Sequence, residues 1–346
     1  MPRRPLSALA AALVACRVLA SDPLPALGAD RAVTVSGISS GGFMAVQLHV
    51  AHSSTVKGAG VLAGGPFYCA QGNVWAALNN CTSPTARAPV PPVELLKADA
   101  ELLARGGLID PLANLATSRV WLFVGTLDRV VEPPVVEATR RFYALFKPPP
   151  ENIVLVADKR AGHGMITADA GVACELTAAP FINDCDFDAA GALLRHLLGP
   201  LEPPAAKESG RILQFDQKPF AGGDAFAIGM GDSGYLYLPK VCETEACRVH
   251  VAFHGCRMSV EQIGERFVRE AGYNRWADSN RIVVVYPQTT PRNGPGFRDW
   301  RWSFVFNPRG CWDWWGYSGQ QYANKTGPQI RALKAMLDRL TAPRGR

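Results

Sequence analysis

A serine, an aspartate and a histidine in this chain are placed so that together they could activate a serine hydroxyl for nucleophilic attack. Ser39 is the centre of the pentapeptide GISSG at 37–41, between the β-branched run 32–35 and the apolar run 43–48. A G-x-S-x-G sequence between a strand and a helix forms a sharp turn that exposes the serine hydroxyl. The competing interpretation is an ordinary turn of small residues, and the choice depends on whether the chain supplies a base and an acid.

The base and the acid follow two further predicted strands. Asp128 comes directly after the buried run 120–125, and His163 lies between two glycines after the run 152–157. The order Ser, Asp, His along the chain is that of the α/β-hydrolases. A neutral imidazole takes the serine proton, and a carboxylate holds the imidazole in the required tautomer. We therefore predict Ser39 as nucleophile, His163 as base and Asp128 as the acid that orients the base.

These assignments have structural alternatives. Asp128 could instead cap the helix predicted over 133–146, as aspartates often do. Asp158 and Asp169 are weaker rivals for the acid because they share a loop with His163. His163 is favoured by elimination because its flanking glycines free the loop, whereas the other histidines considered fall inside predicted helices or a strand: His49, His52, His196 and His250.

The second half of the chain contains elements that normally precede a nucleophile turn. The run 250–256 reads as a strand that ends in His-Gly, like the oxyanion loop of lipases and esterases. The strand 283–288 and the amphipathic helix 326–340 resemble the elements that usually lead into the turn. We therefore predict a circularly permuted α/β-hydrolase fold, with a mostly parallel central sheet flanked by helices. A linker at about 200–210 would join the halves of a single domain; the alternative is two separate domains.

The predicted circular permutation places a second backbone amide, from the second half of the chain, beside the nucleophile. We predict an oxyanion hole made by the N–H of Ser40, next to the nucleophile, and the N–H of Cys256, after the His-Gly pair. Such amides stabilise the charge of a tetrahedral intermediate, and removing one typically costs about 3 kcal/mol of barrier. His254 is expected to shape this loop by hydrogen bonding and not to act as a second base.

Aromatic residues gather late in the chain. Six of the eight tryptophans fall between 276 and 315, and four aromatic residues alternate in strand fashion over 300–306. Adjacent tryptophans beside glycine and aspartate, as in 311–317, are difficult to bury together. We expect part of this cluster to face a cleft or the surface, which suits a hydrophobic or insoluble substrate.

Composition and the first residues indicate export. Of 346 residues 48% are hydrophobic, enough for a large core, and the net charge of +6 is spread without a Lys/Arg block, which disfavours nucleic acid as a partner. Two early arginines, the apolar run 6–15 and the small-residue site 18–20 predict a signal peptide over 1–20 and a mature domain over 21–346. The apolar run is too short to span a bilayer. The alternative is a lipoprotein signal with a lipid anchor on Cys16.

The cysteines favour the same compartment. Eight of the nine remain once Cys16 is set aside, an even number suited to disulfides under oxidising conditions. None shows the spacing of a zinc site, so we predict no metal. Eight cysteines allow 105 connectivities. Spacing favours three local bridges, Cys69–Cys81, Cys174–Cys185 and Cys242–Cys247, and Cys256 and Cys311 then remain for a long-range bridge.

Together, these motifs resemble the extracellular polyhydroxybutyrate depolymerases of the circularly permuted, single-domain kind. The resemblance implies a secreted serine esterase that cuts the ester bonds of poly(3-hydroxybutyrate), releasing monomer and short oligomers without metal or organic cofactor. It also implies that Trp312 contacts the substrate carbonyl, and we expect Trp314, Trp315 and Tyr317 to contact substrate beside it. The matching segments extend from about residue 30 to 340: GISSGGFMA at 37–45, GTLD at 125–128, GHG at 162–164, FHGC at 253–256 and VYPQ at 285–288.

Two other functions remain open at this point. Feruloyl and acetylxylan esterases share the His-Gly-Cys and Tyr-Pro-Gln patterns, so a carbohydrate-ester or small-ester esterase is the first alternative. The second is a non-catalytic surface lipoprotein that binds hydrophobic polymer through its tryptophans. We expect a monomer without the separate polymer-binding domain that many depolymerases carry.

Overall fold

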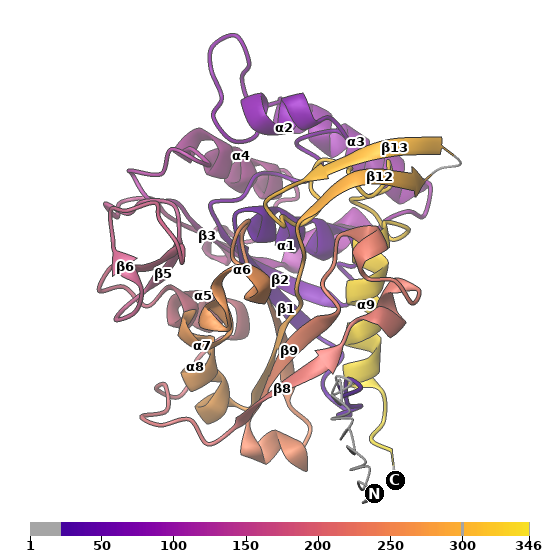
Figure 1. Cartoon of the computed structure of the whole chain (residues 1–346). Coiled ribbons are helices and arrows are strands. Elements are labelled where there is room, and N and C mark those ends of the chain that lie inside the picture. Colours follow the sequence, from indigo (N-terminus) through magenta and orange to yellow (C-terminus); the bar gives the residue numbers. More distant parts are fainter. Residues whose placement is uncertain (1–21, 299–300, 346) are drawn as a thin grey trace, which may run out of the picture.

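An eight-stranded sheet lies at the centre of the protein (Figure 1). The structure is a computed structural model and describes residues 22–298 and 301–345. The strand order is β4-β3-β2-β1-β10-β11-β9-β8; the first six strands run parallel, and β9 is antiparallel to both of its neighbours. The strands are β1 (Val33–Ile38), β2 (Val56–Leu62), β3 (Arg119–Phe123), β4 (Ile153–Val156), β8 (Arg211–Asp216), β9 (Ser233–Leu238), β10 (Arg248–Phe253) and β11 (Ile282–Tyr286).

The order of the strands confirms the predicted circular permutation. β1 pairs in parallel with β2 on one side and with β10 on the other, so that Val35 lies opposite both Ala59 and Val251. The nucleophile strand therefore lies beside a strand that comes about two hundred residues later. The segment 200–210, predicted as a linker, runs without regular structure from α5 (Ala189–Leu198) to β8.

Helices cover both faces of the sheet, as the continuous apolar runs of the parallel strands require. α1 packs on β1 and β2, and α4 and α9 lie with it, while α5 and α8 pack on the opposite face. The predicted helices over 133–146 and 326–340 are α4 and α9. The helices are α1 (Ser40–Ala51), α2 (Val74–Asn80), α3 (Val93–Arg105), α4 (Pro133–Ala144), α5 (Ala189–Leu198), α6 (Val260–Ile263), α7 (Arg266–Glu270), α8 (Tyr273–Asn280) and α9 (Pro328–Thr341).

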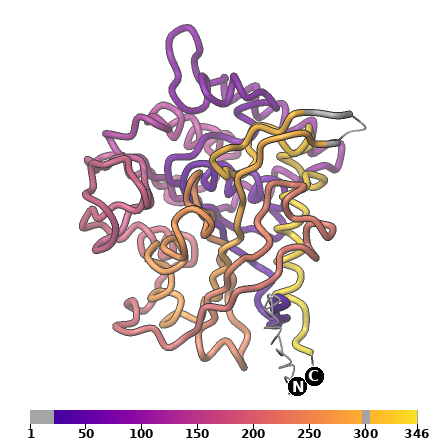
Figure 2. Tube along the Cα trace, in the orientation of Figure 1, coloured from indigo at the N-terminus to yellow at the C-terminus, as the bar shows by residue number. Residues whose placement is uncertain are grey.

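The beginning and the end of the described chain lie side by side (Figure 2). The amides of Leu27 and Ala29 both donate to the carbonyl of Leu340, at 3.1 and 3.2 Å, near the end of α9. Neighbouring termini are the usual companion of a tolerated permutation. The predicted signal peptide and Cys16 lie outside the described residues.

Two smaller sheets stand at the carboxyl ends of the central strands. One consists of β5 (Met165–Thr167), β6 (Val172–Ala173) and β7 (Ile182–Asp184). The other is the hairpin of β12 (Arg292–Arg298) and β13 (Arg301–Asn307), which lies near α2 in Figure 1. The predicted aromatic strand over 300–306 is thus largely β13; Trp300 lies outside the described residues, while Phe304 and Phe306 are exposed.

All four predicted disulfides are present, namely Cys69–Cys81, Cys174–Cys185, Cys242–Cys247 and Cys256–Cys311. Within residues 22–298 and 301–345, no helix is long and apolar enough to cross a membrane. The same residues contain no group of three or more His, Cys, Asp or Glu side chains that could hold a metal ion.

Candidate active site

Ser39 occupies the sharp turn between β1 and α1. Its backbone has φ 85° and ψ −116°, in a region that residues other than glycine rarely adopt. Strain of this kind persists where the surrounding structure enforces it, and it is common at active sites. The turn leaves Ser39 at the carboxyl end of β1 and directly before the first turn of α1.

Two glycines make this turn possible. A Cβ atom on Gly37 would lie 2.4 Å from the backbone of Gly41, on the far side of the turn. A Cβ atom on Gly41 would lie 2.4 Å from the carbonyl oxygen of Phe253, the last residue of β10. The G-x-S-x-G spacing is therefore required by close backbone contacts, and the second of these contacts brings β10 next to the nucleophile.

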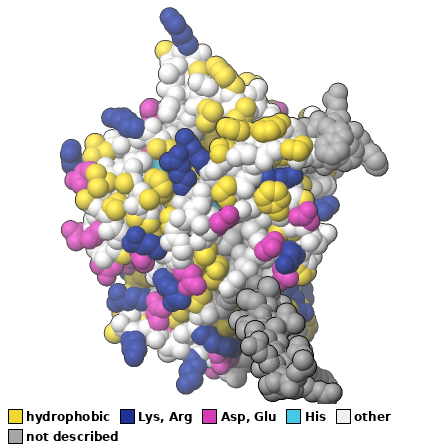
Figure 3. All heavy atoms as spheres, in the orientation of Figure 1, with side chains coloured by type: hydrophobic (Ala, Val, Ile, Leu, Met, Phe, Trp, Pro, Cys, Tyr) yellow, Lys and Arg dark blue, Asp and Glu magenta, His cyan; other side chains and the backbone are white. Residues whose placement is uncertain are grey.

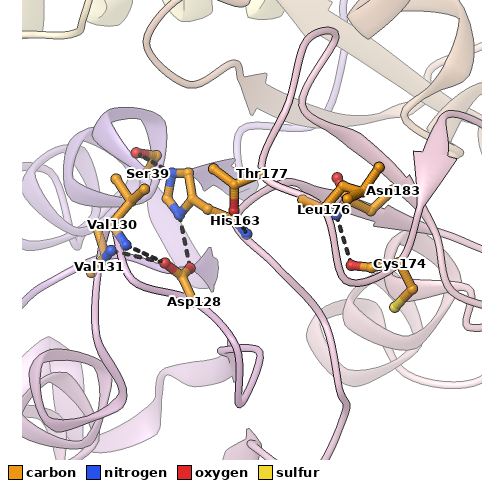
Figure 4. A network of polar contacts seen from close by, with 9 residues as sticks. All are labelled: Ser39, Asp128, Val130, Val131, His163, Cys174, Leu176, Thr177 and Asn183. Atoms are coloured by element: carbon orange, nitrogen blue, oxygen red, sulfur yellow. Dashed lines mark hydrogen bonds and ion pairs between the residues drawn. The ribbon is translucent and has the colours of Figure 1, made fainter.

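Ser39, His163 and Asp128 form a continuous chain of hydrogen bonds (Figure 4). The Ser39 Oγ lies 2.9 Å from His163 Nε2, and His163 Nδ1 lies 2.8 Å from Asp128 Oδ2. With the imidazole neutral, its Nδ1–H donates to Asp128 and its Nε2 accepts the serine proton, which is the arrangement of a hydrolytic triad. All three side chains are buried, with Asp128 the most enclosed.

The surroundings of Asp128 decide between the two interpretations of this residue. Its Oδ1 accepts the amides of Val130 and Val131 at 2.8 and 2.9 Å, which leaves Oδ2 for His163. α4 begins at Pro133, with Glu132 at its N-cap, so Asp128 does not cap this helix. The rival acids are far more exposed and pair with basic residues on the surface: Asp158 with Lys159 and Asp169 with Arg275.

The loop that carries His163 is fixed by its own contacts. The His163 amide donates to Thr177 Oγ1 at 2.9 Å, and the Gly162 amide donates to the Cys174 carbonyl at 2.8 Å. The Asn183 side-chain amide donates to the carbonyls of Cys174 and Leu176 (Figure 4). With the Cys174–Cys185 bridge, these bonds hold the imidazole toward Ser39.

The predicted oxyanion donors lie on either side of Ser39. Ser40 begins α1, and Cys256 follows β10 and lines the same cavities as Ser39. A Cβ atom on Gly255, the residue before Cys256, would lie 3.3 Å from the Cβ of Ser39, so the loop is close to the nucleophile. Among the described residues, neither the Ser40 nor the Cys256 amide has an acceptor. Both amides are thus free to bind a substrate oxygen.

His254 has the loop-shaping environment expected for it. Its Nε2 accepts the Thr289 amide at 3.2 Å, so its Nδ1 carries the proton and donates to the Gly255 carbonyl at 2.7 Å. The Trp312 indole N–H donates to the His254 carbonyl at 3.1 Å. Burial lowers the pKa of His254 to about 4, although its bond to Gly255 opposes the shift. A neutral imidazole whose two nitrogens are occupied by backbone groups is structural.

Comparisons with known proteins agree with this geometry. A polyhydroxybutyrate depolymerase of Talaromyces funiculosus is 34% identical over 94% of this chain and 94% of its own length. A poly(3-hydroxybutyrate) depolymerase of Delftia acidovorans is 44% identical over 98% of this chain, which spans 66% of that relative. This chain belongs to the polyhydroxybutyrate depolymerases. A scan against protein-family models gives no match.

Solved structures of the same family have the fold of this chain. The crystal structure of a PHB depolymerase from Penicillium funiculosum matches with a TM-score of 0.82 and 32% identity over 92% of this chain and 98% of that one. A PHB depolymerase structure, a serine-to-alanine variant complexed with an R3HB trimer, matches with a TM-score of 0.83 and 33% identity at the same coverage. The chain therefore has the permuted α/β-hydrolase fold with a mostly parallel central sheet.

Two cavities meet at Ser39. The first, which we name the His163 pocket, has a volume of about 730 Å³, and the second, the tryptophan pocket, about 460 Å³. Ser39 and Cys256 line both. The His163 pocket is also lined by His163, Thr177, Phe181, Arg257, Met258 and Arg309; the tryptophan pocket by Phe43, Leu78, Phe306, Arg309, Trp314 and Trp315.

The predicted aromatic contacts divide into two groups. Trp314 and Trp315 line the tryptophan pocket, and Trp314 stacks on Phe43 with ring centroids 4.0 Å apart. Trp312 is fully buried, and the buried Tyr317 donates its hydroxyl to the Cys311 carbonyl at 2.7 Å. Neither Trp312 nor Tyr317 lines either cavity, and their hydrogen bonds hold the loops behind the site.

The sequence analysis expected part of the late aromatic cluster to face a cleft or the surface, but it missed the exposed apolar side chains of α2 beside the tryptophan pocket. Trp75 and Leu78 on α2 are each 60% exposed, and Phe304 and Phe306 on β13 are 69% and 61% exposed. Figure 3 shows hydrophobic side chains gathered over this part of the molecule. The available signal was the pair of large apolar residues, Trp75 and Leu78, at helical spacing inside the loop closed by Cys69–Cys81.

Proposed function

We propose that this protein is a secreted serine esterase that hydrolyses the ester bonds of poly(3-hydroxybutyrate) to monomer and short oligomers. The observation that carries the proposal is the unbroken hydrogen-bond chain from Ser39 through His163 to Asp128. In the proposed roles, Ser39 is the nucleophile, His163 the base and Asp128 its orienting acid. No metal or organic cofactor takes part in the proposed reaction.

The first step of the proposed reaction forms an acyl-enzyme. Ser39 Oγ attacks the ester carbonyl while His163 Nε2 takes its proton, and Asp128 stabilises the resulting imidazolium. The amides of Ser40 and Cys256 would stabilise the oxyanion, with each donor contributing on the order of 3 kcal/mol. The tetrahedral intermediate then breaks the ester C–O bond and leaves the acyl group on Ser39.

The proton transfers suggest which cavity holds which part of the substrate. The leaving alkoxide must accept its proton from His163, and this residue lines the His163 pocket but not the tryptophan pocket. We therefore assign the leaving alcohol to the His163 pocket and the acyl part to the tryptophan pocket, against Trp314 and Trp315. Water, activated by His163, then attacks the acyl-enzyme and releases the acid. Trp312 and Tyr317 support the site in this proposal without touching substrate.

The apolar surface of α2 and β13 is proposed to bind the solid polymer. Trp75, Leu78, Phe304 and Phe306 present large apolar side chains to water beside the crevice. Exposed apolar patches of this kind mark interaction surfaces. A polyester without charges along its backbone provides a surface that such side chains can cover.

The proposed location is extracellular. Four disulfides are typical of an oxidising compartment, and the predicted signal peptide over 1–20 would direct export. A lipid anchor on Cys16 is the alternative to release. Globomycin sensitivity of processing in a bacterial host distinguishes an anchored protein from a released one.

The test of the proposed function compares three ester substrates. Purified protein should lower the turbidity of a poly(3-hydroxybutyrate) suspension, and the Ser39→Ala variant should still adsorb to the polymer without clearing it. Release of ferulate or of acetate from xylan should be at least a hundred-fold slower per enzyme. Rapid release of ferulate or acetate with an unchanged polymer suspension would contradict the proposal and favour a carbohydrate-ester esterase.

A further inference from the structure

Three arginines line the two cavities that meet at Ser39. Arg257 and Arg309 line the His163 pocket, and Arg129 and Arg309 line the tryptophan pocket; all three are exposed residues. In the described part of the chain, none of them forms an ion pair or a side-chain hydrogen bond, and no Asp or Glu lines either cavity. Basic side chains in a cavity without acidic neighbours attract anions. Figure 3 shows Lys and Arg side chains gathered near the centre of this face, below the apolar area.

Arg257 and Arg309 are held next to each other by the backbone. The Arg257 amide donates to the Arg309 carbonyl at 2.7 Å, and the Cys256–Cys311 bridge joins the same two loops with Cα atoms 4.2 Å apart. Arg257 also has φ 63°, in the left-handed region that long side chains seldom adopt. The nearest acid on α6, Glu261, accepts the Thr290 hydroxyl and lines a different hollow. The fold thus places two cationic side chains together at one cavity and keeps acids away from it.

The proposed substrate has a charge at one place only. A chain of 3-hydroxybutyrate units is neutral along its length and carries a single carboxylate at its carboxyl end. In an ester of this chain, the alcohol that leaves is the part that contains the carboxyl end. The leaving alcohol belongs in the His163 pocket because His163 must protonate it, and this is the pocket that Arg257 and Arg309 share.

We propose that Arg257 and Arg309 bind the terminal carboxylate of an oligoester in the His163 pocket, so that hydrolysis proceeds preferentially from the carboxyl end. A planar guanidinium matches a carboxylate with paired N–H donors. Each turnover consumes one water, breaks one ester C–O bond and releases a hydroxy acid from this pocket. The shortened chain leaves Ser39 with a new carboxylate, which is again a substrate for the same pair. This inference rests on the proposed function and specifies its substrate.

The experiment compares two soluble oligomers that differ in one charge. A linear 3-hydroxybutyrate tetramer is supplied as the free acid and as its methyl ester, and kcat/KM is measured for the wild type and for Arg257→Gln, Arg309→Gln and the double variant. We expect the wild type to prefer the free acid about tenfold, the single variants about threefold and the double variant not at all. Raising the ionic strength should weaken the wild-type preference because salt screens exposed charges.

The methyl ester serves as the internal control for folding and for the catalytic triad. Its kcat/KM should fall less than that of the free acid in each of the three variants, and Arg331→Gln on α9, an exposed arginine away from both cavities, should leave both kcat/KM values and the wild-type preference unchanged. Equal kcat/KM for the acid and the methyl ester in the wild type would overturn the inference and leave the proposed function intact. Parallel losses on both oligomers in the arginine variants would overturn it as well. Failure of the wild type to hydrolyse either oligomer would overturn the proposed function and this inference together.

Discussion

Ser39 keeps its strained backbone dihedral angles because close packing around the turn constrains the chain. Gly37 faces Gly41 across the turn, and Gly41 lies against the end of β10. A residue with a side chain at either position would push β1, α1 and β10 apart. Cys256, the proposed oxyanion donor, follows β10, so the close approach of β10 at Gly41 also holds Cys256 near Ser39.

Replacing Gly41 tests, at the residue scale, whether the turn needs the close approach of β10. Gly41→Ala would place a methyl group 2.4 Å from the Phe253 carbonyl oxygen and 2.5 Å from that of His254. Overpacking of this kind typically costs 1–3 kcal/mol, and we expect the free energy of unfolding to fall by about 2 kcal/mol and esterase activity to fall more than a hundred-fold.

Gly106→Ala is the matched control for this prediction. Gly106 has φ −76°, and its added methyl group would lie 3.6 Å from the nearest atom. Urea unfolding and oligomer hydrolysis should both stay near wild type in this variant. A fully active Gly41→Ala protein would show that β10 does not need to approach the turn so closely.

At the scale of elements, β1 and β10 are joined by more than their backbone ladder. His250 on β10 lies with Nδ1 2.8 Å from Thr34 Oγ1 and Nε2 2.7 Å from Ser36 Oγ, both on β1. The Ser36 hydroxyl also lies 2.7 Å from the Tyr273 hydroxyl on α8. This buried polar network fixes the strand that carries the nucleophile to the strand that carries the oxyanion loop.

The network makes stability depend on pH. Burial lowers the pKa of His250 to about 3, against 6.5 in an unfolded chain. Between pH 6.5 and pH 3, His250 is protonated in the unfolded state but neutral in the folded state. The free energy of unfolding therefore falls as the pH falls through this range. For one such histidine the loss between pH 7 and pH 5 is about 2 kcal/mol.

A variant separates the contribution of His250 from other titrations. His250→Gln should lower the free energy of unfolding at pH 7, because it changes the hydrogen bonds of residue 250 to β1. It should also reduce the loss of unfolding free energy between pH 7 and pH 5 by about 2 kcal/mol. Urea unfolding at a series of pH values measures both quantities. An unchanged slope in the variant would mean that His250 is not neutral and buried in the folded state.

The second prediction at the scale of elements is that the exposed apolar surface of α2 contributes to adsorption on the polymer. Trp75→Ser removes a large exposed apolar side chain that lines neither cavity, and we expect adsorption to a poly(3-hydroxybutyrate) film to weaken about tenfold. The ratio of polymer to soluble-oligomer activity should fall with it. Leu102→Ser on α3, which removes an equally exposed apolar side chain away from the cavities, should keep the ratio. Equal effects of both substitutions would argue against a specific polymer-binding face.

At the scale of the whole molecule, the disulfides differ in what they hold. Cys256–Cys311 closes a loop of 55 residues and joins the oxyanion loop to the tryptophan segment, while Cys242–Cys247 closes a loop of 5. By loop entropy the long bridge stabilises by about 4 kcal/mol and the short one by about 2 kcal/mol. Replacing each pair by alanine and measuring urea unfolding tests this order.

The same pair of variants has a second readout. Loss of the long bridge should also lower kcat, because this bridge holds the loop whose Cys256 amide is the proposed oxyanion donor, while loss of the short bridge should leave kcat near wild type. A destabilisation that is the same for both variants, or an unchanged kcat without the long bridge, would contradict the account.

The sequence predicted the fold, the disulfides and the positions of the triad residues because local signals carry them. Apolar runs, glycine turns and cysteine spacing are properties of short segments, and the chain order of Ser39, Asp128 and His163 follows the strands. Local signals could not predict that Trp312 and Tyr317 are buried, because their burial depends on loops that the Cys256–Cys311 bridge joins. The apolar face of α2 and the arginine pair were missed for the same reason: each arises where distant segments meet.

Labelling with a fluorophosphonate tests the central claim most directly, since this probe reacts with a serine that an adjacent base has activated. Peptide mapping by mass spectrometry should find one adduct, on Ser39, in parallel with loss of ester hydrolysis. The adduct should be missing in Ser39→Ala and strongly slowed in His163→Ala. An adduct on another residue, or ester hydrolysis that persists in Ser39→Ala, would contradict the account.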